Sequence, residues 1–343
     1  MTGLRPEMDT GSLSVLAMVN LYQITDLGMR KMIDSILKLI IQIIITLLIA
    51  PFFTGVIRKM KAKVQHRVGA SVFQPYFDLS KLFKKDLVVS GTASWIYNVA
   101  PYVYFVTALA AMCCLPVIYQ LTGFLFYTDM LIVVYLFVAG RVFMALAGLD
   151  TGSTFGGMGS SREMLVSALV EPALFIVIVT ISARAEIAST NIGYIYRYMS
   201  VNTVSSFTPM NILLFASMLL ILIAETSRIP VDDPATHLEL TMVHEAMILE
   251  YSGRHLAFIQ WGTYIKQLVF MTIMANILMP VGFNIANPLL GIGVYILKLL
   301  VITVLLGLVE LNTVKFRLFS IPNFAVIALV ISVLGFFTGF IFR

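Results

Sequence analysis

The chain has 343 residues, of which 59% are hydrophobic and only 12% are charged, and its net charge is +5. Soluble domains carry about 25% charged residues, so this chain lacks the polar surface that a soluble protein of its size needs. Its apolar excess is expected to face lipid. Lys and Arg gather beside the apolar stretches, which the positive-inside rule explains without nucleic acid. The composition predicts an all-α, polytopic membrane protein.

Residues 1–35 are predicted to form a weakly amphipathic extension, and residues 36–343 a single transmembrane domain. The apolar run Leu13 to Val19 is too short to span a bilayer. About eight later stretches are long enough to cross about 30 Å at about 1.5 Å per residue. They are Ile36–Ile57, Trp95–Ile118, Asp129–Leu149, Met164–Ser182, Pro209–Arg228, Phe258–Val281, Leu289–Val309 and Ile321–Phe342.

Two long loops, 58–94 and 225–257, follow the first and fifth of these stretches. Loop 58–94 holds eight Lys or Arg, whereas loop 119–128 holds none. The positive-inside rule therefore predicts that both long loops are cytoplasmic and that both termini face outside.

The sequence shows no binding motif for a cofactor. Cys113 and Cys114 are adjacent, and two cysteines cannot ligate an iron–sulfur cluster. The chain also lacks a glycine-rich dinucleotide motif and a P-loop. We expect it to bind no metal and to carry no redox centre of its own.

The first long loop contains an amphipathic segment. Its apolar side chains recur near helical spacing, and its charged side chains take the other side; they are Phe73, Tyr76, Leu79 and Phe83 against Asp78, Lys81, Lys84 and Lys85. Such a helix can lie in the membrane interface with its cations at the headgroups. It is either a plain interface helix or part of a docking floor for a soluble partner.

This loop resembles the first-loop signature of a known family, that of the H-type membrane subunit (subunit 1) of respiratory complex I. That family has relatives in membrane-bound, energy-converting [NiFe] hydrogenases. The matching residues are Arg67-Val68-Gly69, Gln74-Pro75, Asp78 and Lys81-Leu82. Ala70 stands where the family usually has Pro. The resemblance implies that Arg67, Gln74, Asp78 and Lys81 help to dock a partner.

A second block is similar to the hydrogenase-4 component C and formate hydrogenlyase subunit 4 branch. It comprises residues 149–153, 159–163 and 169–172. Within it, Glu171 lies inside a predicted span, where a lone carboxylate costs about 2.5–3.5 kcal/mol on insertion scales and must face the bundle interior or water. Glu171 is either a structural carboxylate paired with a cation or a proton-relay group, and Pro172 can bend the helix beside it.

Other ionisable side chains fall at bilayer depth and could pair with Glu171 or with the second long loop. They are Arg141, Lys266 and Lys298, with Glu310 at a span end. Each is either a structural partner or a path residue, and Lys298 could also snorkel to the interface. We include Arg141 and Lys266 with Glu171 among the candidate coupling residues.

The second long loop gathers six of the chain's eighteen acids. Crowded carboxylates repel one another, and some should bind protons near neutral pH, where histidine also titrates. The candidate proton-path residues are Glu225, Arg228, Asp232, Asp233, His237, Glu239, His244, Glu245 and Glu250. The alternatives are a solvated acidic loop and a metal site. His244-Glu245 lacks the second histidine of H-E-x-x-H, and Asp233 with His237 supplies only two ligands.

The second long loop also matches the family's pattern, through Glu225…Pro230-x-Asp232 and Glu239-Leu240…Glu250-Tyr251-Ser252-Gly253. Ala235 and His237 stand where the family usually has two glutamates, and the segment before Glu250 is about three residues longer. These departures weaken the expectation of quinone binding, and His244 and Glu245 could substitute. Tyr251 and Arg254 are further candidate docking residues.

The resemblance implies a non-catalytic subunit of a multisubunit [NiFe] hydrogenase or formate hydrogenlyase-type complex in the cell membrane of a prokaryote. Hydrogenase large and small subunits and an iron–sulfur subunit would dock on the two long loops. Those partners would carry the [NiFe] centre and the iron–sulfur clusters, and antiporter-like membrane subunits would move H⁺ or Na⁺. The alternatives are the H-type subunit of a quinone-reducing complex, a stand-alone ion transporter and a passive anchor. A transporter would predict repeats and broken helices that the sequence does not show.

Overall fold

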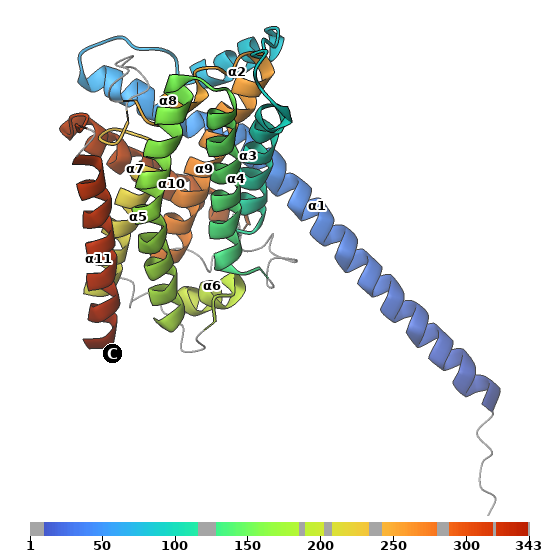
Figure 1. Cartoon of the computed structure of the whole chain (residues 1–343). Helices are drawn as coiled ribbons and strands as arrows, with labels where there is room; N and C mark the ends of the chain where they lie inside the picture. The colour runs from blue at the N-terminus through green and yellow to red at the C-terminus, as the bar shows by residue number, and fades with distance from the viewer. Residues whose placement is uncertain are drawn as a thin grey trace, which may run out of the picture.

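A computed structural model describes residues 10–115, 128–184, 189–201, 208–232, 242–279, 288–317 and 320–341. Helices dominate these residues, which form a bundle (Figure 1). They are α1 Thr10–Val64, α2 Gln74–Lys84, α3 Trp95–Cys113, α4 Met130–Asp150, α5 Thr154–Arg184, α6 Ile192–Val201, α7 Pro209–Glu225, α8 His244–Ile248, α9 Gly253–Ile273, the π-helix η5 Met274–Leu278, α10 Pro288–Asn312 and α11 Ile321–Ile341. The predicted all-α, polytopic class is confirmed.

Each of the eight predicted spans falls on one of these helices. Within the described residues, six helices are long and apolar enough to cross a membrane: α1 from Ile33, α3, α4, α5, α10 and α11. The apolar helix α7 is shorter, with 17 residues. Helix α9 is as long as α4, at 21 residues, but buries the polar side chains Lys266 and Gln267. Helix α9 thus carries a charged side chain into the bundle, as the more apolar α4, α7 and α10 do with Arg141, Glu225 and Lys298.

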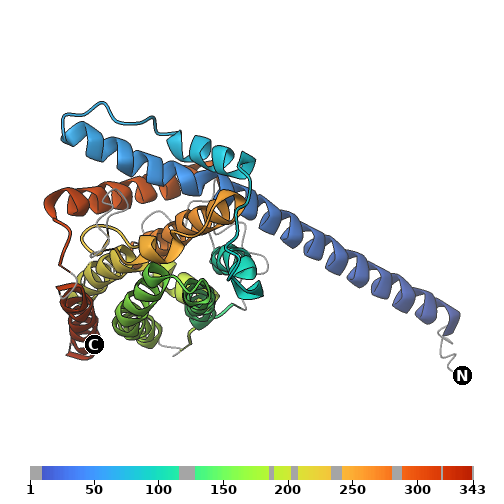
Figure 2. The ribbon, with the colours of Figure 1, turned by 45° about the horizontal axis from the view of Figure 1, so that its top comes forward.

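Helix α1 runs without a break through residue 35, where the sequence suggested a boundary. Part of it packs against α9 and α10, and its N-terminal part projects away from the bundle (Figure 2). Near the point of departure, the side-chain amide of Gln42 donates to the carbonyl oxygens of Met112 and Leu115 at 2.9 and 2.7 Å. These bonds tie α1 to the end of α3, where Met112 also accepts from the Leu115 N–H at 3.2 Å.

Close contacts between small residues and aromatic rings let the central helices approach one another. Helix α3 packs on both α4 and α9. A Cβ on Gly262 of α9 would lie 2.8 Å from the ring of Tyr104 on α3, so glycine is needed for this approach. Membrane helices generally associate through such small-residue surfaces, because lipid offers them no hydrophobic driving force.

The two long loops lie at the same end of the bundle, where α2 and α8 are found, and α6 lies at the opposite end (Figure 1). The loops contact each other directly. Ser252 Oγ donates to the Val88 carbonyl at 3.0 Å and accepts from the Val88 N–H at 2.9 Å. Tyr97 Oη donates to the Glu250 carbonyl at 2.6 Å. These contacts join the loops into one surface above the bundle.

Gly159 on α5 permits the close packing of the α8 segment, and we expect its substitution by Ala to lower the melting temperature. A Cβ at this position would lie 2.7 Å from the Met247 backbone nitrogen and 3.0 Å from the Val243 carbonyl oxygen. Overpacking of this kind costs about 1–3 kcal/mol.

The matched control is Gly157→Ala, because a Cβ at Gly157 meets nothing within 4 Å. It removes a helix-interior glycine and should be neutral or stabilising by about 0.5–1 kcal/mol. Thermal unfolding of the purified protein in detergent would compare the two variants. Equal melting temperatures would contradict the packing seen at Gly159.

Candidate functional site

Arg141 lies at the centre of a buried ion network that joins four helices. Its guanidinium on α4 contacts the carboxylates of Glu171 on α5 and of Glu225, the last residue of α7. Lys266 on α9 reaches Glu225 with its Nζ 2.7 Å from Oε2. Glu163 on α5 adds a third carboxylate, 3.9 Å from Arg141 Nε. These five residues are called the ion network below.

Burial in the ion network is uneven. The side chains of Arg141, Lys266 and Glu225 are 5%, 4% and 3% exposed, whereas that of Glu171 is 32% exposed. Removing such charges from water is costly, so each needs a partner in the bundle interior. Glu171 is the most exposed side chain of the ion network.

Helical spacing explains why two of the carboxylates meet one arginine. Glu163 and Glu171 are eight residues apart on α5 and so share a face, slightly over two turns apart. Phe137, one turn before Arg141 on α4, lies beneath the Lys266 ammonium, 5.6 Å from ring centroid to Nζ. Arg141 and the ring that contacts Lys266 thus lie on the same face of α4.

A second cluster of charges lies around Glu310 near the end of α10. Its carboxylate binds Arg228 at 2.7 Å and Lys61 of α1 at 2.8 Å. Arg228 also donates to the side-chain oxygen of Gln267 at 2.5 Å, and Thr54 donates to the same oxygen at 3.1 Å. This Glu310 cluster connects α1, α9 and α10 with the turn that follows α7.

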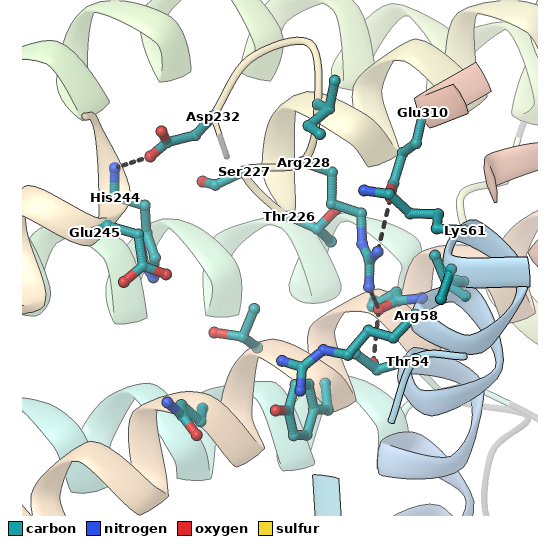
Figure 3. A pocket seen from close by; sticks show the side chains of 18 of the residues that line it. Thr54, Arg58, Lys61, Thr226, Ser227, Arg228, Asp232, His244, Glu245 and Glu310 are labelled. Carbon is teal, nitrogen blue, oxygen red and sulfur yellow. Dashed lines mark hydrogen bonds and ion pairs between the residues drawn. The ribbon is translucent and has the colours of Figure 1, made fainter. Parts of the chain in front are cut away.

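A cavity of about 720 Å³ lies beside the Glu310 cluster, between α1, α9, the turn after α7 and the start of α8 (Figure 3). Its basic lining side chains are Arg58, Lys61, Arg67 and Arg228. Its acidic lining side chains are Asp232, Glu245 and Glu310, with His244 beside them. Apolar side chains such as Ile57 and Ile259 share the wall. The cavity is therefore amphipathic, with charges of both signs.

Asp232 is fully buried at the rim of this cavity. Its Oδ2 accepts hydrogen bonds from the backbone N–H groups of Val243 and His244, both at 3.0 Å, and its Oδ1 binds Lys315 at 3.0 Å. Asp232 therefore ties together the two chain segments that flank residues 233–241. The candidates Asp233, His237 and Glu239 fall in that interval, outside the described residues.

The remaining candidates from the second long loop lie apart from the ion network. Glu250 and Arg254 are exposed. Tyr251 is buried and stacks on Tyr97, with ring centroids 4.2 Å apart and planes within 2°. Burial first, and then Tyr97 and Asp150, raise the pKa of Tyr251 above its ordinary value. Its hydroxyl therefore stays protonated and donates to the Tyr97 carbonyl at 3.1 Å.

The first-loop candidates surround α2. Asp78 accepts from Gln74 at 2.8 Å and pairs with Arg58 at 3.4 Å, while Lys81 is exposed. Arg67 lines the cavity instead. The structure thus places Lys81 on the outer surface of the first loop, with Gln74 and Asp78 half-buried beside Arg58.

The structure brings together Arg141, Glu171, Glu225 and Lys266, and it gathers Arg228, Asp232, His244 and Glu245 around the cavity. Sequence reasoning did not select several of their partners: Lys61, Glu163, Gln267 and Lys315. The eight-residue spacing to Glu171 could have identified Glu163. Nothing local pointed to Lys315. Over the described residues, no three His, Cys, Asp or Glu side chains are grouped to hold a metal ion.

Known proteins resemble this chain in sequence over most of its length. Hydrogenase-4 component C of Escherichia coli (strain K12) is 32% identical over 82% of this chain and 89% of its own length. Formate hydrogenlyase subunit 4 of the same strain is 31% identical over 84% and 94%. The H-type subunit of the NADH-quinone oxidoreductase of Wolinella succinogenes is 28% identical over 75% and 80%.

A chain from the structure of the membrane-bound sulfane sulfur reductase, an archaeal respiratory membrane complex, has the same fold. Its TM-score is 0.76 at 19% identity, and the match covers 89% of this chain and 99% of that one. With the sequence relatives, the fold defines a multi-pass membrane subunit of a complex I-like assembly. The chain belongs to the NADH dehydrogenase family, whose model matches residues 37–339. The resemblance seen in the loop motifs is confirmed.

We expect Arg141→Met to destabilise the protein far more than Arg58→Met. Removing one partner of a buried ion pair costs about 3–5 kcal/mol, because it leaves a buried charge uncompensated. The half-exposed pair of Arg58 with Asp78 contributes about 0–1 kcal/mol. Thermal unfolding in detergent and the amount of protein in the membrane measure the difference. Similar losses for the two variants would contradict a central role for Arg141 in the fold.

Proposed function

We propose that this chain is the docking and ion-coupling subunit of an energy-converting [NiFe] hydrogenase or formate hydrogenlyase-type complex. In this role it links redox chemistry in soluble subunits to translocation of protons or sodium ions. The names of two relatives, hydrogenase-4 component C and formate hydrogenlyase subunit 4, support this class of complex. The ion network is the observation that carries the coupling part of the proposal.

The ion network has one more carboxylate than it has cations. Glu163, Glu171 and Glu225 face Arg141 and Lys266, so the fully ionised network carries a net charge of −1. In a low-dielectric interior, an uncompensated charge favours uptake of a proton. Glu171 is the most exposed of the three carboxylates and is the group to which that proton would bind. A network of this kind can bind and release one proton without losing its cations.

The ion network and the cavity share structural elements, which supplies a physical route for coupling. Glu225 ends α7, and Arg228, three residues later, lines the cavity and binds Gln267. Gln267 is next to Lys266, the second partner of Glu225, on α9. A change of charge or position in the cavity would therefore act on the network through adjacent residues of α7 and α9.

Docking of the soluble partners is assigned to the surface that the two long loops form together. The loops contact each other through Val88 and Ser252, and Tyr251 of the second loop stacks on Tyr97 at the start of α3. They present Lys81 and Arg254 outward. We place hydrogenase large and small subunits and an iron–sulfur subunit over this surface on the cytoplasmic side of a prokaryotic cell membrane. These partners would carry the [NiFe] centre and the iron–sulfur clusters, and antiporter-like subunits would lie beside the bundle.

The cavity favours a second candidate function, that of the H-type subunit in a quinone-reducing complex. Its volume of about 720 Å³ falls in the range of small-molecule sites, about 300–1,000 Å³. Its mixed apolar and charged lining could hold a ring with polar substituents. In that case the ion network would respond to quinone reduction rather than to hydrogen turnover.

We expect Glu171→Gln to uncouple ion movement from redox turnover in the intact complex, because the amide cannot take up a proton. The matched control is Asp34→Asn, which neutralises an exposed carboxylate on α1 that pairs with Lys38. Ion uptake per electron would be measured in proteoliposomes. The relay role is wrong if Glu171→Gln retains the wild-type ratio.

Purification of the chain from its native membrane tests the assembly. Co-purification of [NiFe] hydrogenase large and small subunits is the expected result. A flavin-containing NADH-oxidising module with quinone reductase activity would instead support the second candidate. A homo-oligomer that moves ions without partners would support a stand-alone transporter and contradict both.

A further inference from the structure

Lys298 is a buried cation outside the ion network. It lies in the middle of α10 and is 8% exposed. Its ammonium donates to the Ala275 carbonyl oxygen at 3.2 Å. Over the described part of the chain no carboxylate pairs with it. An ammonium at this depth with a single carbonyl partner is costly, since its charge is uncompensated.

The partner carbonyl belongs to a short π-helix that makes it available. Within η5, the N–H of Met279 bonds to the carbonyl of Met274, five residues earlier. The same pattern would pair Ala275 with residue 280, which is Pro and has no N–H. The Ala275 carbonyl is therefore open to Lys298. Single-turn π-helices of this kind occur frequently at functional sites.

Polar side chains lie on the helices beside this position inside the bundle. Thr272 Oγ1 and Tyr295 Oη are 2.8 Å apart, and Tyr196 of α6 hydrogen bonds with the side chain of Asn276. Tyr295 is one turn from Lys298 on the same face of α10. We call Lys298, Tyr295, Thr272, Asn276 and Tyr196 the Lys298 cluster. Each of them is buried.

Two stacked aromatic rings lie between Lys266 of the ion network and the Lys298 cluster. Phe137 of α4 stacks on Phe270 of α9 with centroids 5.2 Å apart, and Lys266 lies over the Phe137 ring. Along α9, Phe270 falls between Lys266 of the network and Thr272 of the cluster. Tyr196 comes from α6, which lies at the end of the bundle opposite α2 and α8 (Figure 1). The cluster is thus a separate polar site on the far side of the network from the long loops.

We propose that the Lys298 cluster is a second proton-transfer site, which connects the ion network with the opposite side of the membrane. The inference rests on the proposed coupling function and extends it to this end of the bundle. The Lys298 ammonium releases one proton to the hydroxyls of Tyr295 and Thr272, which pass it to water at the α6 end. The neutral amine then takes up the proton that Glu171 of the ion network releases, so Lys298 regains its original charge.

Few other titratable groups lie near Lys298 to compete with it for the proton. Among the described residues, the titratable side chains of the cluster besides Lys298 are Tyr196 and Tyr295. Helix α9 and η5 contribute Thr272 and Asn276, which do not titrate. The charged contact between α1 and α10 lies near the other end of α10, where Lys61 binds Glu310. Lysine, unlike arginine, gives up its proton readily when buried.

The test compares Lys298→Arg with Lys298→Met in the intact complex. Arginine keeps a cation that can bond to the Ala275 carbonyl, but it does not release a proton under these conditions. We expect both variants to keep redox turnover while ion translocation per electron falls by about tenfold or more. Tyr295→Phe should slow translocation several-fold with assembly unchanged. The control Lys38→Met replaces a partly exposed lysine of α1 and should behave as wild type.

Each outcome decides the matter. Wild-type coupling in Lys298→Arg would show that Lys298 only satisfies the Ala275 carbonyl, and the inference is overturned. If Lys298→Arg does not assemble, Tyr295→Phe decides, and an unchanged ion-to-electron ratio again overturns it. Glu171→Gln is measured in parallel. If Glu171→Gln loses coupling while Lys298→Arg keeps it, the Lys298 inference is wrong but the proposed function stands. A wild-type complex that moves no ion defeats the proposed function and this inference together.

Discussion

The positive charge of a guanidinium inside an apolar bundle needs negative partners, and the arrangement of the central helices depends on how Arg141 obtains them. Its carboxylate partners come from α5 and α7, and Lys266 of α9 binds one of the same carboxylates. Four helices are therefore held at fixed rotations, because turning any one of them would leave a charge buried without a partner. The same requirement keeps the end of α7 and the stretch of α9 from Ile259 to Gln267 next to the cavity. The ion pairs set the rotations of the helices, and packing between small residues and aromatic rings holds the helices close together.

The buried charges form a series from the long loops toward the α6 end. Asp232 ties the second loop to Lys315, the Glu310 cluster borders the cavity, the ion network lies deeper, and Lys298 lies beyond the Phe137–Phe270 stack. Each group is close enough to the next to share a helix or a turn with it. Relatives named for hydrogenase, formate hydrogenlyase and NADH-quinone oxidoreductase complexes match most of this chain in sequence. One family of membrane subunit therefore occurs in complexes with different names.

Much of the fold could be predicted from hydropathy. Each apolar stretch identified in the sequence lies on a helix, and the amphipathic first-loop segment is α2. Glu171, Arg141 and Lys266 could be selected as interior groups because a charge in an apolar stretch has few other places to go. The environment of the acids in the second long loop could not be predicted in the same way. Their sequence is equally compatible with a solvated loop, yet Asp232 is fully buried and bonded to two backbone N–H groups and a lysine.

The sequence by itself determined that this is a membrane protein with ionisable groups at bilayer depth, since composition and hydropathy are local properties of the chain. Its loop motifs also identified the family. Only the tertiary structure decided which charges meet: Arg141 with Glu171 and Glu225, Glu310 with Arg228 and Lys61, and Lys298 with a carbonyl of a π-helix. The physical reason is that pairing depends on the rotation and depth of helices distant in sequence. Those are set by packing of the whole bundle, which no local pattern encodes.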